Sequence, residues 1–414
     1  MKQNMFMKGV SNNLLIFESG LQLSREYWLK DFIDLGYNLF LAQPWPITWE
    51  HPYITKYLKI QFNPWTPEEQ TKLLKFISEN KIHGIICLNE GTVPFASDII
   101  EALGLPRFSG ENIRNLRNKK LMRQKLFNSG ILQPQFIYVD DITTFERNTI
   151  KYPAVVKPAE MMASLGVKLV NSDDELAKAI TAAQNVDFNG ENLRNHYGFD
   201  KGVLIESYLK GKELSIETFV QNGKVIDFFI TQKFKCAEPY FDEIGHLANP
   251  QISNSQFVAI REFINLLHKN LSILNAITHT EVKIDGDQVG LIEIGCRPGG
   301  DLIPLIHKYS ASVSFAEVAA KINMGIQVDH NWLPIEQRKE VAVFFPHDGA
   351  AFTTTRSELE AQLVDTQIYQ FIFNKNKEPI NDGLATSRKG QVVFSHFHST
   401  EDILNKLVFM SGGI

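Results

Sequence analysis

The sequence has only three cysteines, no surplus of positive charge and no long apolar run. Its cysteines, Cys87, Cys236 and Cys296, lie too far apart for a disulfide framework or a paired-cysteine zinc site, and this usage is typical of a reducing compartment. The formal net charge of −5 provides no basic excess for nucleic acid or an anionic membrane. No stretch reaches the roughly 20 apolar residues that span a bilayer, and residues 1–13 lack the apolar segment of a signal peptide. We therefore expect a cytoplasmic protein with no nucleic-acid or membrane partner.

The first hundred residues alternate between strand-like and helix-like patterns. Strands are predicted at 13–18, 38–42 and 84–88, and helices at 24–35, 67–81 and 92–103. This alternation predicts a parallel sheet built of βαβ units. The glycine pattern G-x-G-x-x-G is absent, which argues against a dinucleotide site in this part. The segment 43–67, which contains tryptophans and prolines, is predicted to be an irregular connection packed on the sheet.

The second half of the chain is richer in strands. They are predicted at 153–158, 167–170, 203–208, 214–220, 225–233, 278–284 and 289–294. Asn222-Gly223 and Asp285-Gly286 are typical of tight hairpin turns, so the later strands are predicted to form a large antiparallel sheet. Helices are expected at 253–271 and 314–324, and the polar stretch 187–201 is predicted to be a loop.

A chain of 414 residues is too long for one ordinary core. The predicted fold class is therefore mixed, α/β followed by α+β. The expected segments are an N-terminal α/β domain at 1–112, a connecting helix at 113–124, a small α+β unit at 125–208, a large antiparallel unit at 209–330 and an α+β appendage at 331–414.

Two glutamates give the clearest chemical signal. If 285–289 forms a tight hairpin, Glu281 lies opposite Glu293 on one face of two antiparallel strands. Like charges in that position are destabilising alone, and they become favourable around a divalent cation such as Mg²⁺, which prefers oxygen ligands. The alternative is a pair of solvent-facing glutamates on an exposed hairpin. Apolar residues beside the pair favour a substantial sheet with its opposite face buried: Val282, Ile284, Ile292 and Ile294.

Just beyond the second strand, Arg297-Pro298-Gly299-Gly300-Asp301 places a fixed cation beside exposed backbone amides. This arrangement could bind a phosphate or a substrate carboxylate. The alternative is an ordinary turn with a salt-bridged arginine.

Further candidates are weaker taken singly. Lys157 ends an apolar strand and needs an anionic partner if it is buried. The small residues of 163–167, with Ser164 and Gly166, suit a phosphate loop, although one glycine is weak support. Glu206 and Glu213 flank a glycine turn that is either an ordinary polar turn or a hinge gripping a nucleoside, and spacing alone favours the turn. Lys119 begins a basic helix, a feature usually just solvated, and His279 is more often a hydrogen-bonded structural residue than a metal ligand.

Taken in order, these motifs resemble the ATP-grasp superfamily over about residues 110–310. They run from Asn118-Lys119-x-x-Met122-Arg123 to Val155-Val156-Lys157-Pro158, then Ser164-x-Gly166-Val167 and Ile205-Glu206-x-Tyr208-x-x-Gly211-x-Glu213. The series ends with His279-Thr280-Glu281 and with Ile292-Glu293-Ile294-Gly295-Cys296-Arg297. Each motif is modest alone, and their order and spacing make the resemblance.

The resemblance implies roles for these positions. Lys119 and Lys157 would contact ATP phosphates under the Ser164–Gly166 loop. The adenine pocket would be lined by Glu206, Tyr208 and Leu209, and ribose would be bound by Glu213. Glu281 and Glu293 would hold Mg²⁺, with Mn²⁺ as a substitute, and Arg297 would stabilise the transferring phosphoryl group or the acyl phosphate. The small unit, which lies between the N-terminal domain and the large antiparallel unit in the sequence, would close as a lid over ATP.

Within the superfamily, the sequence is most similar to bacterial L-amino-acid ligases, which form dipeptides. The features are Arg297-Pro298-Gly299-Gly300-Asp301 and the segment Glu243-Ile244-Gly245-His246. Glu243 would attract a substrate ammonium, His246 would lie near the reacting groups, and Gly299 and Gly300 would line the substrate site. Glu243 and His246 could equally be loop residues. One departure is Gly295, where many members have an asparagine that binds metal; another is the glycine-poor phosphate loop.

The resemblance implies an ATP-dependent carboxylate–amine ligase that acts through an acyl phosphate and releases ADP and phosphate. The alternatives are an ATP-grasp carboxylase that acts through carboxyphosphate and a non-catalytic nucleotide-binding regulator. The expected partners are small molecules. The sequence leaves the oligomeric state open, with a homodimer as the commonest form among soluble oligomers. The sequence leaves open which carboxylate and which amine are joined, because pocket shape sets that choice.

Overall fold

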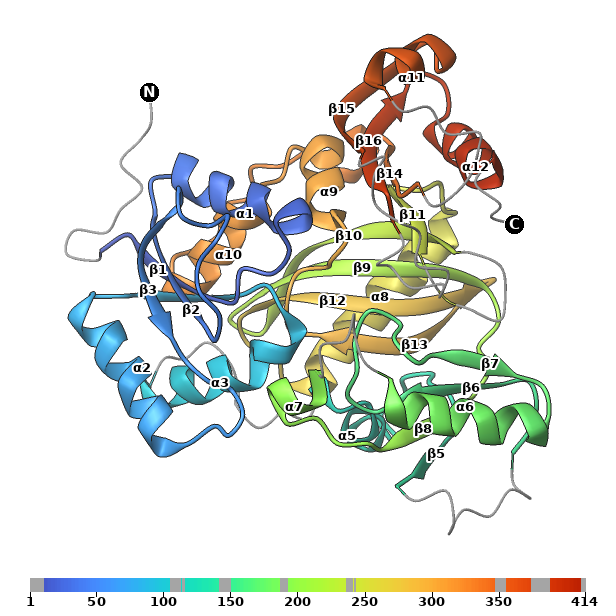
Figure 1. Cartoon of the computed structure of the whole chain (residues 1–414). Coiled ribbons are helices and arrows are strands. Elements are labelled where there is room, and N and C mark those ends of the chain that lie inside the picture. The colour runs from blue at the N-terminus through green and yellow to red at the C-terminus, as the bar shows by residue number, and fades with distance from the viewer. Residues whose placement is uncertain are drawn as a thin grey trace.

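Three sheets organise the chain in a computed structural model (Figure 1). The structure describes residues 11–104, 113, 116–140, 150–186, 193–235, 241, 243–346, 355–373 and 388–410. Cys236 and residues 187–192 of the predicted polar loop lie outside this range. Within the described residues, no helix is both long and apolar enough to cross a membrane.

The first sheet is wholly parallel and has the strand order β3-β2-β1-β4. Its strands and helices are β1 Asn13–Phe17, α1 Gln22–Asp34, β2 Asn38–Gln43, β3 Ile54–Lys59, α2 Pro67–Glu79, β4 Gly84–Cys87 and α3 Val93–Ala102. The predicted parallel α/β unit is confirmed. The prediction of an irregular connection at 43–67 is wrong for residues 54–59, which form strand β3. The strand was missed because it lies at the edge of the sheet, is half polar and lacks the buried apolar run of its neighbours. We call this part the N-terminal unit.

The second sheet is small and antiparallel, with the order β5-β8-β6-β7. It consists of β5 Phe136–Val139, β6 Ala154–Pro158, β7 Lys168–Val170 and β8 Val203–Ser207, and α6 Asp173–Asn185 covers it. We call it the small unit. Before it, Asn118 interrupts the predicted connecting helix, because its backbone is extended and its side chain caps α5 Lys119–Lys125.

The polar stretch 187–201 is not all loop, which corrects the prediction. Residues Leu193–Tyr197 form the short helix α7. Leu193 and Tyr197 are buried in the core of the N-terminal unit, although they belong by sequence to the small unit. Tyr197 also donates a hydrogen bond to the buried carboxylate of Glu18, with an oxygen–oxygen distance of 2.6 Å. The mixed polar composition of the stretch hid these two anchoring side chains.

The third sheet is the largest and its strand pairs are all antiparallel, in the order β13-β12-β9-β10-β11-β14-β16-β15. Its strands are β9 Lys212–Gln221, β10 Lys224–Lys235, β11 Glu243–Ala248, β12 Ala276–Asp285, β13 Gln288–Gly295, β14 Val341–Phe344, β15 Thr366–Phe373 and β16 Gly390–His396. Both predicted hairpins are present, at Asn222-Gly223 and at Asp285-Gly286. The C-terminal segment, predicted to be an appendage, continues the large sheet through β14, β15 and β16. Helices α11 Arg356–Gln362 and α12 Thr400–Met410 pack beside these strands.

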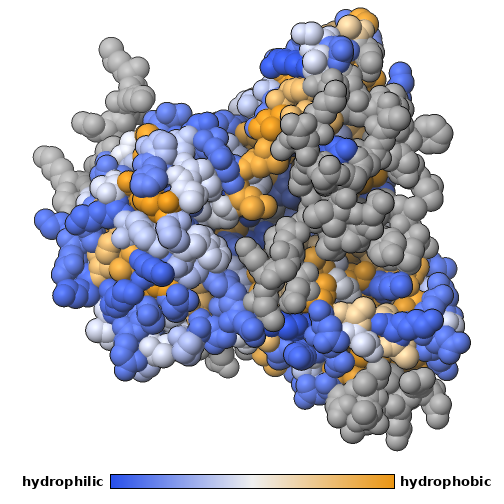
Figure 2. Space-filling view, in the orientation of Figure 1, coloured by the Kyte–Doolittle hydropathy of each residue, from blue (hydrophilic) through white to orange (hydrophobic). Residues whose placement is uncertain are grey.

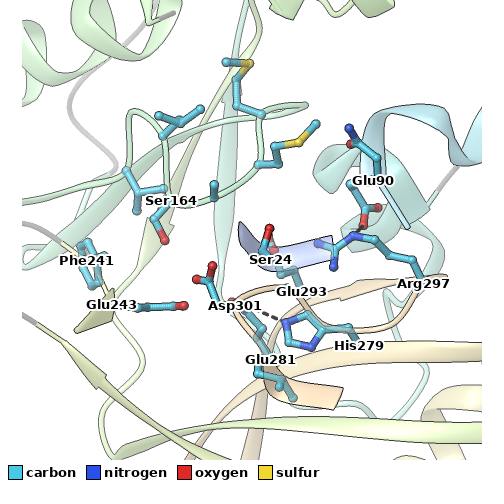
Figure 3. A pocket seen from close by; sticks show the side chains of 18 of the residues that line it. Ser24, Glu90, Ser164, Phe241, Glu243, His279, Glu281, Glu293, Arg297 and Asp301 are labelled. Atoms are coloured by element: carbon cyan, nitrogen blue, oxygen red, sulfur yellow. Dashed lines mark hydrogen bonds and ion pairs between the residues drawn. The ribbon is translucent and has the colours of Figure 1, made fainter. Parts of the chain in front are cut away.

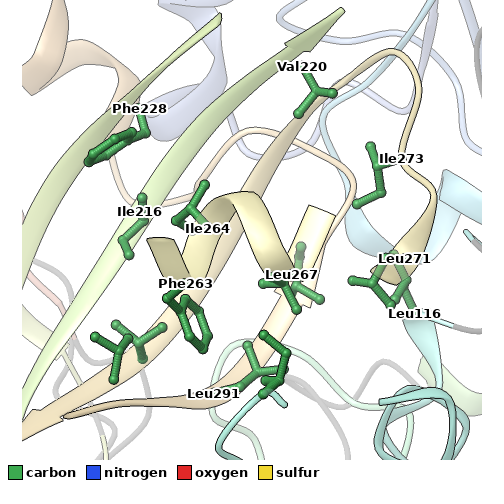
Figure 4. Close-up of a cluster of buried hydrophobic side chains, with 14 of the residues drawn as sticks. Leu116, Ile216, Val220, Phe228, Phe263, Ile264, Leu267, Leu271, Ile273 and Leu291 are labelled. Carbon is green, nitrogen blue, oxygen red and sulfur yellow. The ribbon is translucent and has the colours of Figure 1, made fainter. Parts of the chain in front are cut away.

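Helix α8, Asn254–Leu271, packs across one face of this sheet (Figure 4). Ser253 and Gln256 form a reciprocal capping box at its start, and Ser272 ends it in a left-handed conformation. Its buried stripe includes Phe263, Ile264 and Leu267, which lie among apolar side chains of β9, β12 and β13. Covering one face leaves the other face of β9–β13 free to carry polar groups.

Two further helices join the N-terminal unit to the large sheet. Helix α10, Phe315–Met324, was predicted, whereas α9, Ile303–Ala311, was not. One core cluster contains Trp28 of the N-terminal unit together with Phe219 and Phe229 of the large sheet and Phe315 of α10. This shared core fixes the N-terminal unit against the large sheet, so that a cleft forms where these parts meet the small unit.

Candidate functional site

A cleft of about 1360 Å³ lies between the N-terminal unit, the small unit and the large sheet. The space-filling view shows the hollow between the left and right parts of the molecule (Figure 2). Twelve of the predicted site residues line it: Lys119, Lys157, Ser164, Glu206, Tyr208, Leu209, Glu213, Glu243, Glu281, Glu293, Arg297 and Gly300. His279 also lines it, whereas the predicted Gly166, His246 and Gly299 are not among the lining residues. Residues that are far apart in sequence are thus collected in one place.

Glu281 and Glu293 are directly paired across β12 and β13, which confirms the predicted register (Figure 3). A β-bulge follows Glu281, so that Ile292 lines the cleft rather than the core, contrary to expectation. Burial would raise the pKa of Glu281, but Lys233 and His279 outweigh it and hold that pKa far below its usual range. The pKa of Glu293 is also lowered. Burial would raise it, but the ammonium of Lys119, whose Nζ lies 3.2 Å from the carboxylate, lowers it. Two ionised carboxylates on one face are a donor set that fits Mg²⁺.

The two predicted phosphate-binding lysines are buried and already paired. Lys157 Nζ lies 2.7 Å from Glu206 Oε2, so the anionic partner expected for Lys157 exists. Lys119 Nζ donates to the backbone oxygen of Met161 at 2.8 Å as well as facing Glu293. Burial lowers the pKa of Lys157, because an ammonium loses hydration, and Glu206 opposes that effect. Both cations reach the cleft from the side of the small unit.

Glu206 is held more firmly than a simple turn residue. Arg123 Nε donates to Glu206 Oε1 at 2.9 Å, and both side chains are buried. Burial would raise the pKa of Glu206, yet Arg123 and Lys157 lower it to about 2. Arg123 also donates to the backbone oxygen of Ile292 at 2.6 Å, so this side chain links β8 to the β12–β13 hairpin. The carboxylate of Glu206 is thus committed to two cations, and its predicted place beside adenine stays a prediction.

The loop between β6 and β7 has an unusual backbone. Ala163 and Ser164 have positive φ angles of 55° each, and Gly166 has 72°. A side chain at Gly166 would approach Pro158 and Val186 at 3.1 Å, so only glycine suits this close packing. Ser164 lines the cleft, whereas Gly166 is not among its lining residues (Figure 3).

Tyr208, Leu209 and Glu213 line the cleft at the exit of β8 and the start of β9. Lys235 Nζ lies 2.6 Å from Glu213 Oε1, and Lys283 Nζ lies 3.4 Å from Glu213 Oε2. The three lining residues follow the connection between the small unit and the large sheet, which is the place expected of a hinge.

Glu243 and His246 lie on strand β11, not in a loop as one reading of the sequence allowed. Lys233 Nζ contacts Glu243 Oε1 at 2.5 Å, and His246 Nε2 is 3.3 Å from Glu243 Oε2 and 3.8 Å from an oxygen of Asp301. His246 is fully buried. Burial would lower the pKa of His246, but the carboxylates of Asp301 and Glu243 have the larger effect and raise it. One donor atom from each of Glu243, His246 and Asp301 lies within 4.8 Å of the others. Arg388 holds Asp301 through an ion pair of 2.9 Å.

Arg297 is paired with Glu90 of the N-terminal unit, with Nε 2.6 Å from Oε2 (Figure 3). Glu90 also accounts for the glycine at 295. A Cβ atom at Gly295 would lie 2.5 Å from Glu90 Oε2, so any side chain there would displace this carboxylate. The absence of an asparagine at 295 therefore coincides with a carboxylate that enters the same space from another part of the chain.

Gly299 and Gly300 differ in their surroundings. The amide of Gly299 donates to Glu217 Oε2 at 2.7 Å, and a Cβ there would lie 2.8 Å from Glu217 Oε1. Glu217 also contacts His279 Nδ1, and the His279 Nε2 atom lies 3.1 Å from Glu281. Burial opposes protonation of His279, but Glu217 and Glu281 raise its pKa to about 9. His279 is thus a hydrogen-bonded link behind Glu281, and Gly300 lines the open cleft.

Sequence analysis missed four residues that line the cleft, Arg25, Glu90, Lys233 and Arg388, and it missed Glu217, which contacts His279. Lys233 and Glu217 stand within apolar strands, and the criterion applied to Lys157 would have found them. Glu90 follows the carboxyl end of β4, where ligand sites of parallel sheets gather, so its position also held a signal. Arg25 and Arg388 come from distant parts of the chain, and no sequence signal marked either of them.

Comparison with known proteins points to one family. Residues 150–304 match the model of the ATP-grasp domain. Alanine–anticapsin ligase of Bacillus subtilis is 25% identical over 260 residues, which cover 58% of this chain and 54% of that protein. The chain thus spans about half the length of this curated relative.

Solved structures resemble the chain over almost its full length. The L-amino acid ligase from Bacillus licheniformis has a TM-score of 0.76 and 22% identity, covering 96% of this chain and 97% of that one. N5-carboxyaminoimidazole synthetase from Staphylococcus aureus, solved with ADP, has a TM-score of 0.71 and 14% identity, covering 99% and 98%. At these identities the likeness concerns the fold.

Proposed function

We propose that this chain is an ATP-dependent ligase that joins a carboxylate to an amine, because residues 150–304 match the ATP-grasp domain and the chain has the fold of an L-amino acid ligase. The products would be an amide, ADP and phosphate, with L-amino acids as substrates and a dipeptide as product. The observation that carries the proposal is the Glu281–Glu293 pair facing Lys119 and Arg297 across one cleft. This set of charges suits phosphoryl transfer, which depends mainly on positioning and charge neutralisation.

In the first step, a carboxylate oxygen of the donor attacks the γ-phosphorus of ATP, and the bond to the ADP oxygen breaks. Lys119 and Lys157 would bind the phosphates, and Arg297 would neutralise charge on the transferring group. Glu281 and Glu293 would hold Mg²⁺, which neutralises phosphate charge when bound. For Arg297 to act in this way, its pairing with Glu90 must be shared or released.

In the second step, the amine of the acceptor attacks the acyl carbon and phosphate leaves with its bonding electron pair. The nitrogen loses a proton as the amide forms. Glu243 would attract the ammonium of the donor, and His246 would lie beside it, held by the carboxylates of Glu243 and Asp301. Lys233 and Arg388 already pair with Glu243 and Asp301, so an ammonium would bind here by taking the place of Lys233 beside Glu243.

The small unit would protect the acyl phosphate from water by closing over the cleft. Support comes from α7 and from Met161 and Leu165 of the loop between β6 and β7, which pack into the core of the N-terminal unit. The loop therefore lies between the two units rather than on the outer surface.

The test replaces each proposed metal carboxylate. Glu281→Ala and Glu293→Ala should each lower turnover by about a hundred-fold or more and should weaken Mg²⁺-dependent binding of ADP, measured by calorimetry. Glu262→Ala, on the exposed side of α8, is the matched control and should behave as wild type. Thermal unfolding checks that each variant is folded. Near-normal turnover and ADP binding in both site variants would remove the metal assignment.

A further inference from the structure

The cleft contains one arginine that the proposed chemistry does not use. Seven other lysines and arginines line the cleft and each faces a carboxylate: Lys119, Lys157, Lys233, Lys235, Lys283, Arg297 and Arg388. Within the described part of the chain, Arg25 has no carboxylate at ion-pair distance. Its Nη2 donates to the backbone oxygen of Leu88 at 2.7 Å. A guanidinium has five N–H donors, so most of its capacity is left for a ligand.

The position of Arg25 is fixed by the N-terminal unit. The residue lies in the first turn of α1, after Ser24, which points into the cleft beside Glu293 and Arg297 (Figure 3). Its side chain crosses Gly20, where a Cβ atom would lie 3.1 Å from Arg25 Cγ. Leu88, which accepts its hydrogen bond, directly follows β4. Arg25 is therefore held at the carboxyl ends of β1 and β4 and is not a free surface arginine.

The surroundings favour an anion at Arg25. Arg25 is half-buried, and this burial lowers the pKa of Arg25 to about 10, with smaller effects from Tyr27, Arg297 and Asp301. The side chain remains charged at neutral pH, and a cation that has lost hydration without an anionic partner is unfavourable. A ligand carboxylate would supply the missing partner through paired hydrogen bonds, for which a guanidinium is well shaped.

The reaction proposed above brings three anionic groups into the cleft. The ATP phosphates would meet Lys119 and Lys157 on the side of the small unit, and the donor carboxylate must approach the γ-phosphate near Glu281, Glu293 and Arg297. Arg25 reaches the cleft from another element, helix α1 of the N-terminal unit. The remaining anion is a carboxylate on the amine acceptor. In an α-amino acid this group is one carbon from the amine, so anchoring it would also orient the nucleophile.

We propose that Arg25 binds the free carboxylate of the amine acceptor, so that the enzyme selects an amino acid or peptide as acceptor over a simple amine or an amide. This inference rests on the proposed ligase function and assigns Arg25 as a specificity-determining residue of that reaction.

The test is a competition between acceptors. The purified full-length chain is supplied with ATP, Mg²⁺, a pool of L-amino acids and an equimolar pool of the corresponding L-amino acid amides. The amides cannot serve as donors because they have no free carboxylate, so every dipeptide amide reports an amide used as acceptor. Mass spectrometry gives the ratio of dipeptides to dipeptide amides. We expect a strong preference for dipeptides in the wild type and a fall in this ratio of about ten-fold to a hundred-fold in Arg25→Gln.

Two further variants make the result decisive. Arg25→Lys keeps the charge but loses the paired geometry, and its ratio should fall between those of wild type and Arg25→Gln. Arg261→Gln removes an exposed arginine from α8 and should leave the ratio unchanged. An unchanged ratio in a folded Arg25→Gln variant would overturn the inference, as would equal use of both pools by the wild type. If Arg25→Gln is folded and makes neither product, Arg25 serves the chemistry itself and the inference is wrong. If the wild type makes neither product, the proposed function fails instead.

Discussion

At the scale of single residues, the cleft holds its charges as short ion pairs. Lys233 bridges Glu243 and Glu281, Lys119 faces Glu293, and Glu90 faces Arg297. These contacts offset the cost of burying charged groups in the absence of ligands. Binding of ATP and Mg²⁺ would exchange several of them for contacts with phosphate and metal. These ion pairs are therefore the contacts that binding of a ligand would break.

Gly295 gives a prediction at this scale. Gly295→Asn would place its Cβ atom 2.5 Å from Glu90 Oε2, so the Glu90 carboxylate would have to move and give up its ion pair with Arg297. Leaving a buried polar group without its partner typically costs about 1–3 kcal/mol. We expect the free energy of unfolding to fall by that order, measured by urea denaturation monitored by circular dichroism.

The matched experiment introduces the same change after removing the obstructing carboxylate. In a Glu90→Ala background, Gly295→Asn should cost clearly less, because the two residues compete for one space and their effects are not additive. An equal cost in both backgrounds would show that Glu90 does not determine the glycine at 295.

Individual site residues could be predicted where a charge interrupts an apolar strand. Lys157, Glu281 and Glu293 stand out for that reason, and the register of the last two follows from one hairpin. Glu90 and Arg388 could not be paired with Arg297 and Asp301 beforehand, because their contacts join segments more than 80 residues apart. Such contacts depend on how the units pack, which local patterns do not encode.

At the scale of elements, periodicity predicted the strands and helices that have one buried apolar face. Helix α8 and the β12–β13 hairpin are of this kind. Periodicity failed to predict β3, α7 and α9. The edge strand β3 is half polar, α7 is a single short turn anchored by two side chains, and α9 begins directly after the two left-handed residues Asp301 and Leu302. The bulge after Glu281, which turns Ile292 to the cleft, also leaves no pattern that alternation alone would reveal.

Helix α8 gives a prediction about pH. His268 is buried between α8 and β12, with Nδ1 2.8 Å from the backbone oxygen of Ile264 and Nε2 2.8 Å from Thr278 Oγ1. Burial lowers the pKa of His268 from 6.5 to about 4. Between these values the unfolded chain binds a proton that the folded chain does not, so the contribution of His268 is complete above pH 6.5 and is lost as pH falls toward 4.

We therefore expect His268→Gln to flatten the acid side of the stability curve. One such group contributes at most about 1.4 kcal/mol per pH unit to the slope. Urea unfolding of wild type and variant at about pH 7, 6 and 5 measures the difference. His268→Gln keeps a hydrogen-bonding side chain without the titration, so an unchanged slope in this variant would contradict the role assigned to burial.

At the scale of the whole molecule, function depends on three units meeting at one cleft. A shared core holds the N-terminal unit on the large sheet, and α7 ties the small unit to the N-terminal unit through Tyr197 and Glu18. The order of motifs along the sequence was enough to predict the class of fold, since each motif belongs to one unit. It could not predict that β14, β15 and β16 extend the large sheet, because strand pairing across such distances has no local signature.

The most direct measurement of the central claim is phosphate release from ATP and Mg²⁺ in the presence of pooled L-amino acids, with products identified by mass spectrometry. The ligase account predicts release only when amino acids are present, together with the mass of a dipeptide or a related amide. No release with amino acids, but release with bicarbonate alone, would contradict it and favour chemistry through carboxyphosphate. Binding of ATP without turnover under every acceptor would contradict catalysis altogether.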